Sequence, residues 1–182
     1  MQDDVPKART DAKLRYARIH IDALRTQPVS RGHDFERAHQ EAFLAQLFGA
    51  YAALLQELNI YLGCNLAPDD VTIGKMRKAL KNKGKDSPLL SELYDLEKDQ
   101  SSWFRYAKDM RDHSTHVSGI PLSHYVGGPQ DGVTALRNPK TLVEIPGDAT
   151  DTLSSYLLEM ERLVQRFRDA GEITRKVGSK TT

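Results

Sequence analysis

A single cysteine, Cys64, occurs in the 182 residues of the chain. It excludes an internal disulfide framework and any zinc site built from several cysteine ligands. No apolar run reaches the roughly 18 residues that a membrane-spanning helix needs. The first ten residues lack the apolar core of a secretory signal. We therefore expect a cytoplasmic protein that has no contact with a membrane.

A large excess of one sign of charge is missing as well. The chain has 26 Lys and Arg residues against 25 Asp and Glu residues, and its formal net charge is +1. This balance excludes a chain that is held on nucleic acid by its overall charge, although it is compatible with a local basic patch. The chain also has no Gly-rich phosphate loop, no G-x-S-x-G elbow and no H-E-x-x-H motif. Its length and its 39% hydrophobic residues fit one globular domain.

Helical periodicity is present over most of the chain, because apolar residues recur three and four positions apart. This pattern predicts a mainly α fold, a bundle of five helices over residues 11–25, 34–62, 68–83, 88–117 and 148–170. Residues 42–62 are apolar nearly all round, which is typical of the central helix of a bundle or of a helix shared with a partner chain. Four large side chains are expected to be buried in the bundle: Phe48, Leu54, Trp103 and Leu157.

The predicted helix ends depend on capping residues. Residues 27–32 contain Pro28 and Gly32 and predict the first break. The residues expected to begin helices are Asp34, Ser87 with Pro88, and Asp148 with Asp151 three positions on. The residues expected to end helices are Gly63, Gly84 and Gly171.

Residues 122–146 differ from the rest of the chain, because glycine- and proline-containing turns separate two short β-like runs there. The runs are residues 133–136 and 141–145, and they predict a small β-hairpin inserted before the last helix. We expect residues 1–171 to form a single helical domain that includes this insertion. Residues 172–182 are expected to form a polar C-terminal tail.

A basic cluster follows the second helix, with six cations and no acid in the 11 residues from 75 to 85. It consists of Lys75, Arg77, Lys78, Lys81, Lys83 and Lys85. One interpretation is a solvated helix face. The other is a surface that contacts the phosphates of an RNA backbone, for which the candidates are Lys75, Lys78, Lys81 and Lys83.

Residues 109–116, Asp-Met-Arg-Asp-His-Ser-Thr-His, place five ionisable groups besides two hydroxyls near the end of the fourth predicted helix. The simplest interpretation is a solvated helix end with two i,i+4 pairs, Arg105 with Asp109 and Asp112 with His116. A second interpretation is a metal site formed by Asp109, His113 and His116, whose i, i+4, i+7 spacing can converge on an ion. A further imidazole, that of His124, lies nearby in the sequence.

A third interpretation rests on a resemblance. The segment from Arg111 to His116 resembles the R-x(4–6)-H motif of the HEPN family of helical-bundle domains, and the resemblance covers roughly residues 11–170. It implies metal-independent endoribonuclease activity that leaves a 2′,3′-cyclic phosphate, with no cofactor. His116 would then be the acid and base and Arg111 the phosphate clamp. Asp112 would orient His116, and His113 and Thr115 would be accessory.

A second copy of the bare motif runs from Arg15 to His20. It lies within the first predicted helix, in a context typical of an outward polar face. The copy from Arg111 to His116 ends a helix next to a chain break, where a substrate can approach. We therefore expect the copy from Arg111 to His116 to carry the chemistry.

Helix geometry adds a condition. On a regular helix, five residues separate Arg111 from His116 by about 140° and about 7.5 Å along the axis. One regular helix therefore does not aim both side chains at one phosphate. Either the helix breaks before His116, or two chains join their motifs across a twofold axis, and the resemblance implies the second solution, a homodimer. It also implies an RNA substrate, a toxin–antitoxin or antiphage setting, and a cognate antitoxin or nucleotidyltransferase as partner. The alternative from another class is a catalytically silent helical module that dimerises or binds a nucleotide or a protein.

Overall fold

The structure is a computed structural model that describes residues 4–26 and 32–178, with side chains described for residues 5–26 and 33–170. These residues form six α-helices: α1 (Asp4–Arg25), α2 (Gly32–Tyr61), α3 (Ile73–Asn82), α4 (Pro88–Lys98), α5 (Trp103–His116) and α6 (Ala149–Gly178). They also form strands β1 (Leu122–His124) and β2 (Thr134–Leu136), and two 3-10 turns, Pro68–Asp70 and Gly128–Gln130. The mainly α class is confirmed, and the count of five helices is wrong. Within the described ranges, no helix has the length and apolar content to cross a membrane.

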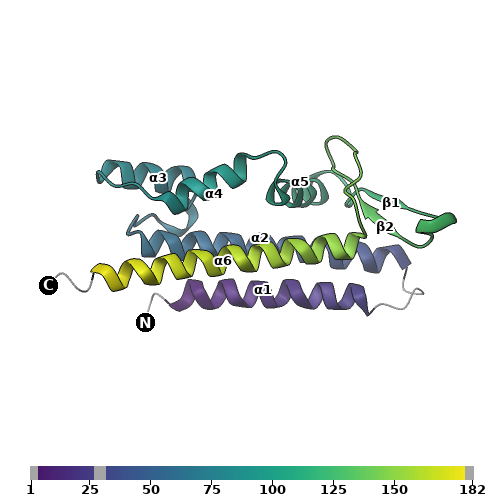
Figure 1. The fold of residues 1–182 in the computed structure, drawn as a ribbon, viewed down its shortest axis with the longest axis horizontal. Coiled ribbons are helices and arrows are strands. Elements are labelled where there is room, and N and C mark those ends of the chain that lie inside the picture. The colour runs from purple at the N-terminus through teal and green to yellow at the C-terminus, as the bar shows by residue number, and fades with distance from the viewer. Residues whose placement is uncertain (1–3, 27–31, 179–182) are drawn as a thin grey trace.

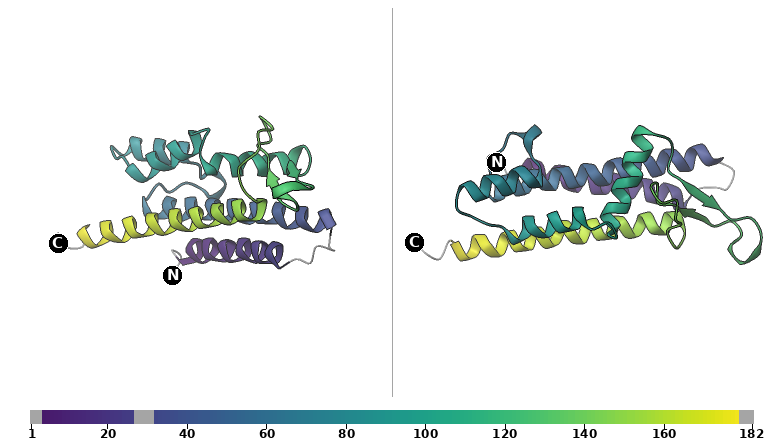
Figure 2. Two further views of the ribbon diagram at one scale, coloured as in Figure 1. Left: turned by 45° about the vertical axis from the view of Figure 1, so that its right-hand side comes forward. Right: turned by 90° about the horizontal axis from the view of Figure 1, so that it is seen from above.

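The helices are stacked in layers (Figure 1). α2 and α6 lie side by side in the middle, α1 covers one side of this pair, and α3, α4, α5 and the β-hairpin cover the other. Seen from above, α5 runs across α2 and α6 rather than along them (Figure 2). The crossing places the end of α5 beside the hairpin and over the beginning of α2.

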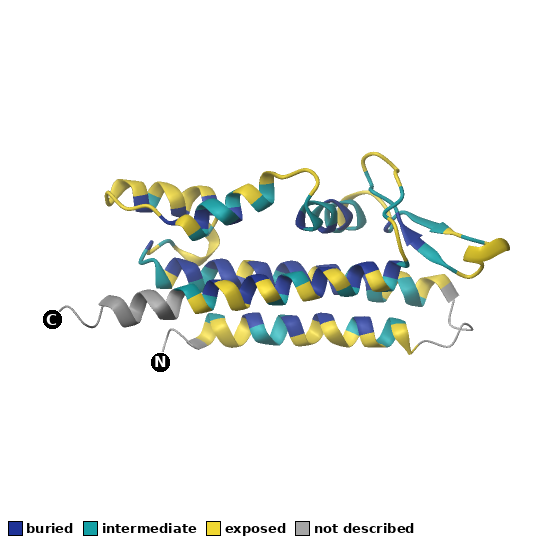
Figure 3. Ribbon diagram, in the orientation of Figure 1, coloured by how far each residue is buried: buried dark blue, intermediate teal, exposed yellow. Residues whose placement is uncertain are grey.

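The core follows α2, whose buried residues occur nearly all round the helix (Figure 3). The amphipathic faces of α1 and α6 and the short helices above all pack on it, which explains why α2 lacks a continuous polar face. Phe48, Leu54 and Leu157 are buried, as predicted. Trp103 is only half-buried, because it lies at the edge of the core between Phe104 and Tyr156, with ring centres 5.6 and 6.0 Å away.

The predicted helix over residues 88–117 is two helices, since α4 ends at Lys98 and α5 begins at Trp103. Polar side chains between them bond to the backbone and stop the first helix. The Asp99 carboxylate accepts bonds from the amide and hydroxyl of Ser101. The Ser102 hydroxyl accepts a hydrogen bond of 3.1 Å from the amide of Arg105 and so caps α5. Buried apolar residues keep helical spacing on both sides of the break. The sequence pattern therefore predicted one continuous helix.

The β-hairpin lies inside the predicted insertion, but its strands differ. β1 pairs antiparallel with β2, Leu122 opposite Leu136 and His124 opposite Thr134. The prediction of a strand over residues 141–145 is wrong, because Leu142 has a φ of 58° and its amide bonds to the carbonyl of Asn138. This turn leaves only an isolated bridge in the segment.

Several helix boundaries also differ. α1 begins at Asp4, and α2 begins at Gly32, so Asp34 lies in its first turn rather than at its cap. Gly171 does not end the last helix, because α6 continues to Gly178; one glycine inside a helix costs only about 1 kcal/mol. Residues 172–178 are therefore helical, whereas 179–182 and the predicted break at 27–31 lie outside the described residues. The glycines at 63 and 84 do have positive φ and follow α2 and α3 as predicted.

Candidate functional site

The end of α5 carries the sequence-predicted catalytic residues. One face of the helix is fixed by burial of Phe104, Ala107 and Met110 in the core. The helix ends where the amides of Val117 and Ser118 both bond to the carbonyl of His113. His113 and His116 lie in the last turn of α5.

Arg111 is held by two partners. Its guanidinium carbon lies 4.5 Å from the centre of the Phe48 ring on α2, a cation–π distance. Its Nε donates to Oδ1 of Asp112 at 2.9 Å, and its Nη2 donates to the same oxygen. About a third of the side chain is exposed. The guanidinium is therefore oriented but also paired with a negative charge.

His116 lies in a different environment from Arg111. It is the last residue of α5 and is exposed, with no side-chain partner among the described residues. Asp112, which we expected to orient His116, pairs with Arg111 instead. The Thr115 hydroxyl bonds back to the carbonyl of Arg111 at 2.8 Å. Within one chain, the structure brings Asp112 to Arg111 but forms no contact between Arg111 and His116.

The three residues of the predicted metal site do not converge. Asp109 is 7% exposed and bonds to Arg105 at 3.2 Å and to Lys140 at 2.9 Å. Nε2 of His113 lies 3.1 Å from the hydroxyl of Ser118. No group of three or more His, Cys, Asp or Glu within the described ranges is arranged to hold a metal ion. The Asp109 carboxylate instead ties the loop after β2 to α5.

All six cations of the basic cluster are exposed, on α3 and the turn after it. Three of them have partners: Lys75 pairs with Asp70 at 2.5 Å, Lys83 donates to the carbonyl of Gly63 at 2.6 Å, and Arg77 lies over the Tyr94 ring. The remaining three have no partner in the described part of the chain: Lys78, Lys81 and Lys85. α3 and the hairpin lie at opposite ends of the molecule (Figure 1), so the cluster is not next to the end of α5.

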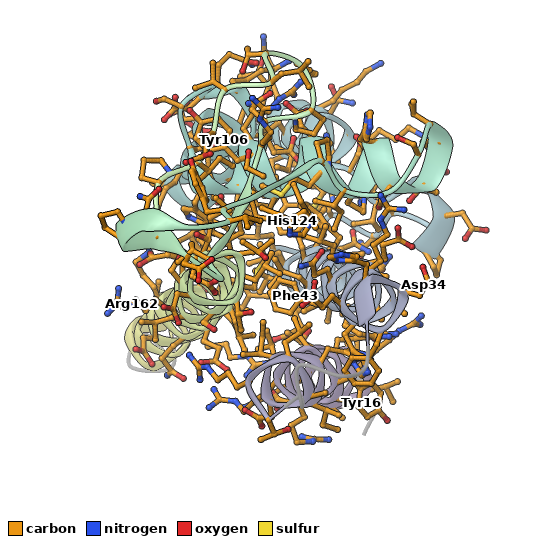
Figure 4. All side chains as sticks on the ribbon, turned by 90° about the vertical axis from the view of Figure 1, so that its right-hand side faces the viewer. Tyr16, Asp34, Phe43, Tyr106, His124 and Arg162 are labelled. Atoms are coloured by element: carbon orange, nitrogen blue, oxygen red, sulfur yellow. The ribbon has the colours of Figure 1, made fainter. Side chains whose placement is uncertain are left out.

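A cavity of about 720 Å³, which the sequence did not predict, adjoins the end of α5. It is lined by His33 and Arg37 from the first turns of α2, by His113, by residues 118–122 and by His124 and Leu142. The rings of His33 and His124 lie 4.7 Å apart. Figure 4 is viewed from the hairpin end and shows His124 between the upper layer and α2. In the sequence, this grouping is signalled by the i,i+4 spacing of His33 and Arg37 and by the closeness of His124 to His113.

In the second copy of the motif, from Arg15 to His20, the histidine contacts another helix. Arg15 is exposed on α1, and Nδ1 of His20 lies 3.1 Å from Nδ1 of His39 on α2. Burial lowers the pKa of His20, and His39 lowers it further. The His20 ring is therefore neutral in the folded protein at neutral pH and packs between two helices.

Comparisons with known proteins gave no match: no protein-family model, no curated protein sequence and no solved structure matches the chain. The function proposed for the chain therefore rests on the geometry at the end of α5 and on the resemblance of its motif.

Proposed function

We propose that this protein is a metal-independent endoribonuclease of HEPN type that acts as a homodimer. The observation that carries the proposal is the end of α5, where an arginine oriented by Phe48 and Asp112 lies one and a half turns from an exposed histidine. The mainly helical architecture agrees with such a domain. The biological setting that we propose is a toxin–antitoxin or antiphage system, with an antitoxin or nucleotidyltransferase as partner.

The proposed chemistry needs one proton carrier and one fixed cation. An imidazole removes the proton of the ribose 2′-hydroxyl, whose oxygen then attacks the adjacent phosphorus. The bond to the 5′-oxygen breaks, this oxygen takes up a proton, and the products are a 2′,3′-cyclic phosphate and a 5′-hydroxyl. His116 is the proposed proton carrier. Arg111 is the proposed group that stabilises the charge on the phosphoryl oxygens.

A second chain would complete the site. Arg111 packs against Phe48 of α2 with about a third of its side chain exposed, whereas His116 faces outward, so the two groups of one chain do not converge on one point. Exposed apolar side chains surround this end of the molecule: Val117 is 73% exposed, Leu142 55% and Val143 65%. Leu142 lines the same cavity as His113. Covering these side chains with a twofold-related copy would remove apolar surface from water.

The alternative is a catalytically silent module that dimerises or binds a nucleotide or protein. One observation favours it: Asp112 already neutralises Arg111, the residue that would have to bind the phosphate. In this case the end of α5 would be an interaction surface, and neither His116 nor Arg111 would be needed for any chemical step.

A cleavage assay with EDTA present distinguishes the ribonuclease from the catalytically silent module. End-labelled single-stranded RNA is incubated with the full chain and with His116→Ala, and the product ends are analysed by mass spectrometry. We expect 2′,3′-cyclic phosphate ends with the wild type, and a loss of about 10²–10⁴-fold in rate with the variant. Equal rates in the two proteins would contradict the proposal, as would activity that EDTA abolishes.

A further inference from the structure

We propose that the cavity between the start of α2, the end of α5 and β1 binds the phosphate of a nucleotide, with Arg37, His33, His113 and His124 as its basic groups. The cavity is distinct from the pair Arg111 and His116, neither of which lines it. The proposal stands whether or not the protein cleaves RNA.

The charge of the lining favours an anion. Three imidazoles, one guanidinium and the Ser118 hydroxyl line the cavity, and none of its lining residues within the described ranges is a carboxylate. The carboxylate of Glu36 lies 3.8 Å from Nδ1 of the lining residue His33. Asp109, the buried acid of α5, is already paired with Arg105 and Lys140 and does not offset the charge of the lining. The Arg37 guanidinium is a fixed positive charge, and it attracts an anion that enters the cavity.

Each histidine keeps one ring nitrogen for a ligand. The contacts use Nδ1 of His33 with Glu36, Nε2 of His113 with Ser118, and Nδ1 of His124 with the Thr134 hydroxyl at 3.1 Å. The second nitrogen of each ring has no protein partner in the described ranges. The hydrogen bonds of His113 and His124 also orient these two rings, and a pre-oriented donor loses less freedom when it binds.

A glycine makes room for the guanidinium. A Cβ atom at Gly119 would lie 2.7 Å from Nε of Arg37 and 2.8 Å from its Cζ. Any other residue at position 119 would therefore displace the guanidinium of Arg37 from its present position. Arg37 makes no ion pair within the described structure, so its charge is available to a ligand.

The size and the apolar part of the lining favour a nucleotide over a bare phosphate. About 720 Å³ lies within the range of pockets that hold small organic ligands. Pro121, Leu122 and Leu142 provide apolar side chains against which a base can pack. The lining thus includes groups for the base as well as for the phosphate.

Isothermal titration calorimetry of the full chain tests the site. The probes are the four nucleoside 5′-monophosphates, the matching nucleosides and a short single-stranded RNA. We expect at least one monophosphate to bind about tenfold or more tightly than its nucleoside, because guanidinium and imidazole contacts to phosphate are charge-assisted. Arg37→Gln and His124→Gln should each weaken that binding by about five- to tenfold.

Gly119→Ala is a second way to remove Arg37 from the cavity while keeping its charge on the protein. It should weaken binding by a similar factor, with an unchanged circular dichroism spectrum, because only the flexible end of Arg37 has to move. The matched controls are Arg162→Gln and His39→Gln, which change the same residue types away from the cavity. Both should bind as the wild type does.

The RNA probe distinguishes the source of the phosphate. Binding of RNA but of no mononucleotide, again lost in Arg37→Gln, would assign the site to a phosphate within a polymer and still support it. Equal affinity for nucleoside and monophosphate, unchanged binding in both Arg37→Gln and Gly119→Ala, or no binding of any probe would overturn it. His116→Ala should keep this binding while losing cleavage, so the two proposals fail separately.

Discussion

The guanidinium of Arg111 on α5 stacks on the ring of Phe48 on α2, with 4.5 Å between its central carbon and the ring centre. Phe48 is itself held in the core by an edge contact with Phe104, 5.3 Å away. The position of Arg111 thus depends on the packing of two helices as well as on its place in the motif. Such a contact is worth about 0.5–1 kcal/mol at a partly exposed site.

Mixing two inactive variants tests the proposed dimer. Arg111→Ala and His116→Ala should each abolish cleavage while keeping the fold and the dimer. If each site takes Arg111 from one chain and His116 from the other, a mixed dimer contains one intact site, and activity should partly return when the two variants are combined and assayed with labelled RNA. No recovery in verified heterodimers would place both residues in one chain. Arg15→Ala with His20→Ala is the control, and full loss of activity there would assign the chemistry to the other copy of the motif.

The Asp112 carboxylate should weaken RNA binding, because it neutralises Arg111 and repels phosphate. Asp112→Asn removes this charge and keeps the size of the side chain. We expect RNA affinity, measured by filter binding with a His116→Ala background, to rise about two- to fivefold, since an exposed ion pair is worth up to about 1 kcal/mol. A fall in affinity would show instead that Asp112 holds Arg111 in its binding orientation.

The basic cluster should act through the lysines that have no partner. Lys78→Gln with Lys81→Gln should reduce the slope of log affinity for single-stranded RNA against log salt by about 1.4, because each phosphate that a lysine neutralises accounts for about 0.7 of the slope. Lys75→Gln with Lys83→Gln is the matched control, and its effect should be smaller because these lysines already bond to Asp70 and Gly63. Identical slopes in all three proteins would leave the cluster as a solvated helix face.

His20 should make the fold less stable in acid. Burial lowers its pKa in the folded state, with His39 adding to the effect, so the unfolded chain binds the proton more readily. The free energy of unfolding should therefore fall as the pH drops below the unfolded value of about 6.5. Guanidinium denaturation at about pH 8 and about pH 5 checks this, and His20→Gln should lose less stability over that interval than the wild type. An equal loss in both proteins would contradict it.

Local patterns in the sequence were sufficient to predict where several of the helices begin and end. The glycines at 63 and 84 end α2 and α3 with positive φ, and Ser87 and Asp148 bond to the first amides of α4 and α6. Such caps involve neighbours within a few residues, so spacing in the sequence predicts them. The sequence did not predict the break at Asp99. The side chains of Asp99 and Ser102 bond to nearby amides there, but the apolar spacing continues through the break and indicates a single helix.

The sequence by itself determined the mainly helical class, the central place of α2 and the position of the Arg111–His116 motif at a helix end. Only the tertiary structure decided that Arg111 faces Phe48, that Asp112 pairs with Arg111 and that His33 meets His124. The physical reason is that periodicity tells which face of a helix is apolar, whereas contacts between helices depend on the angle at which they cross. α5 crosses α2 instead of running along it, and this crossing brings the start of α2, the end of α5 and the hairpin together around one cavity.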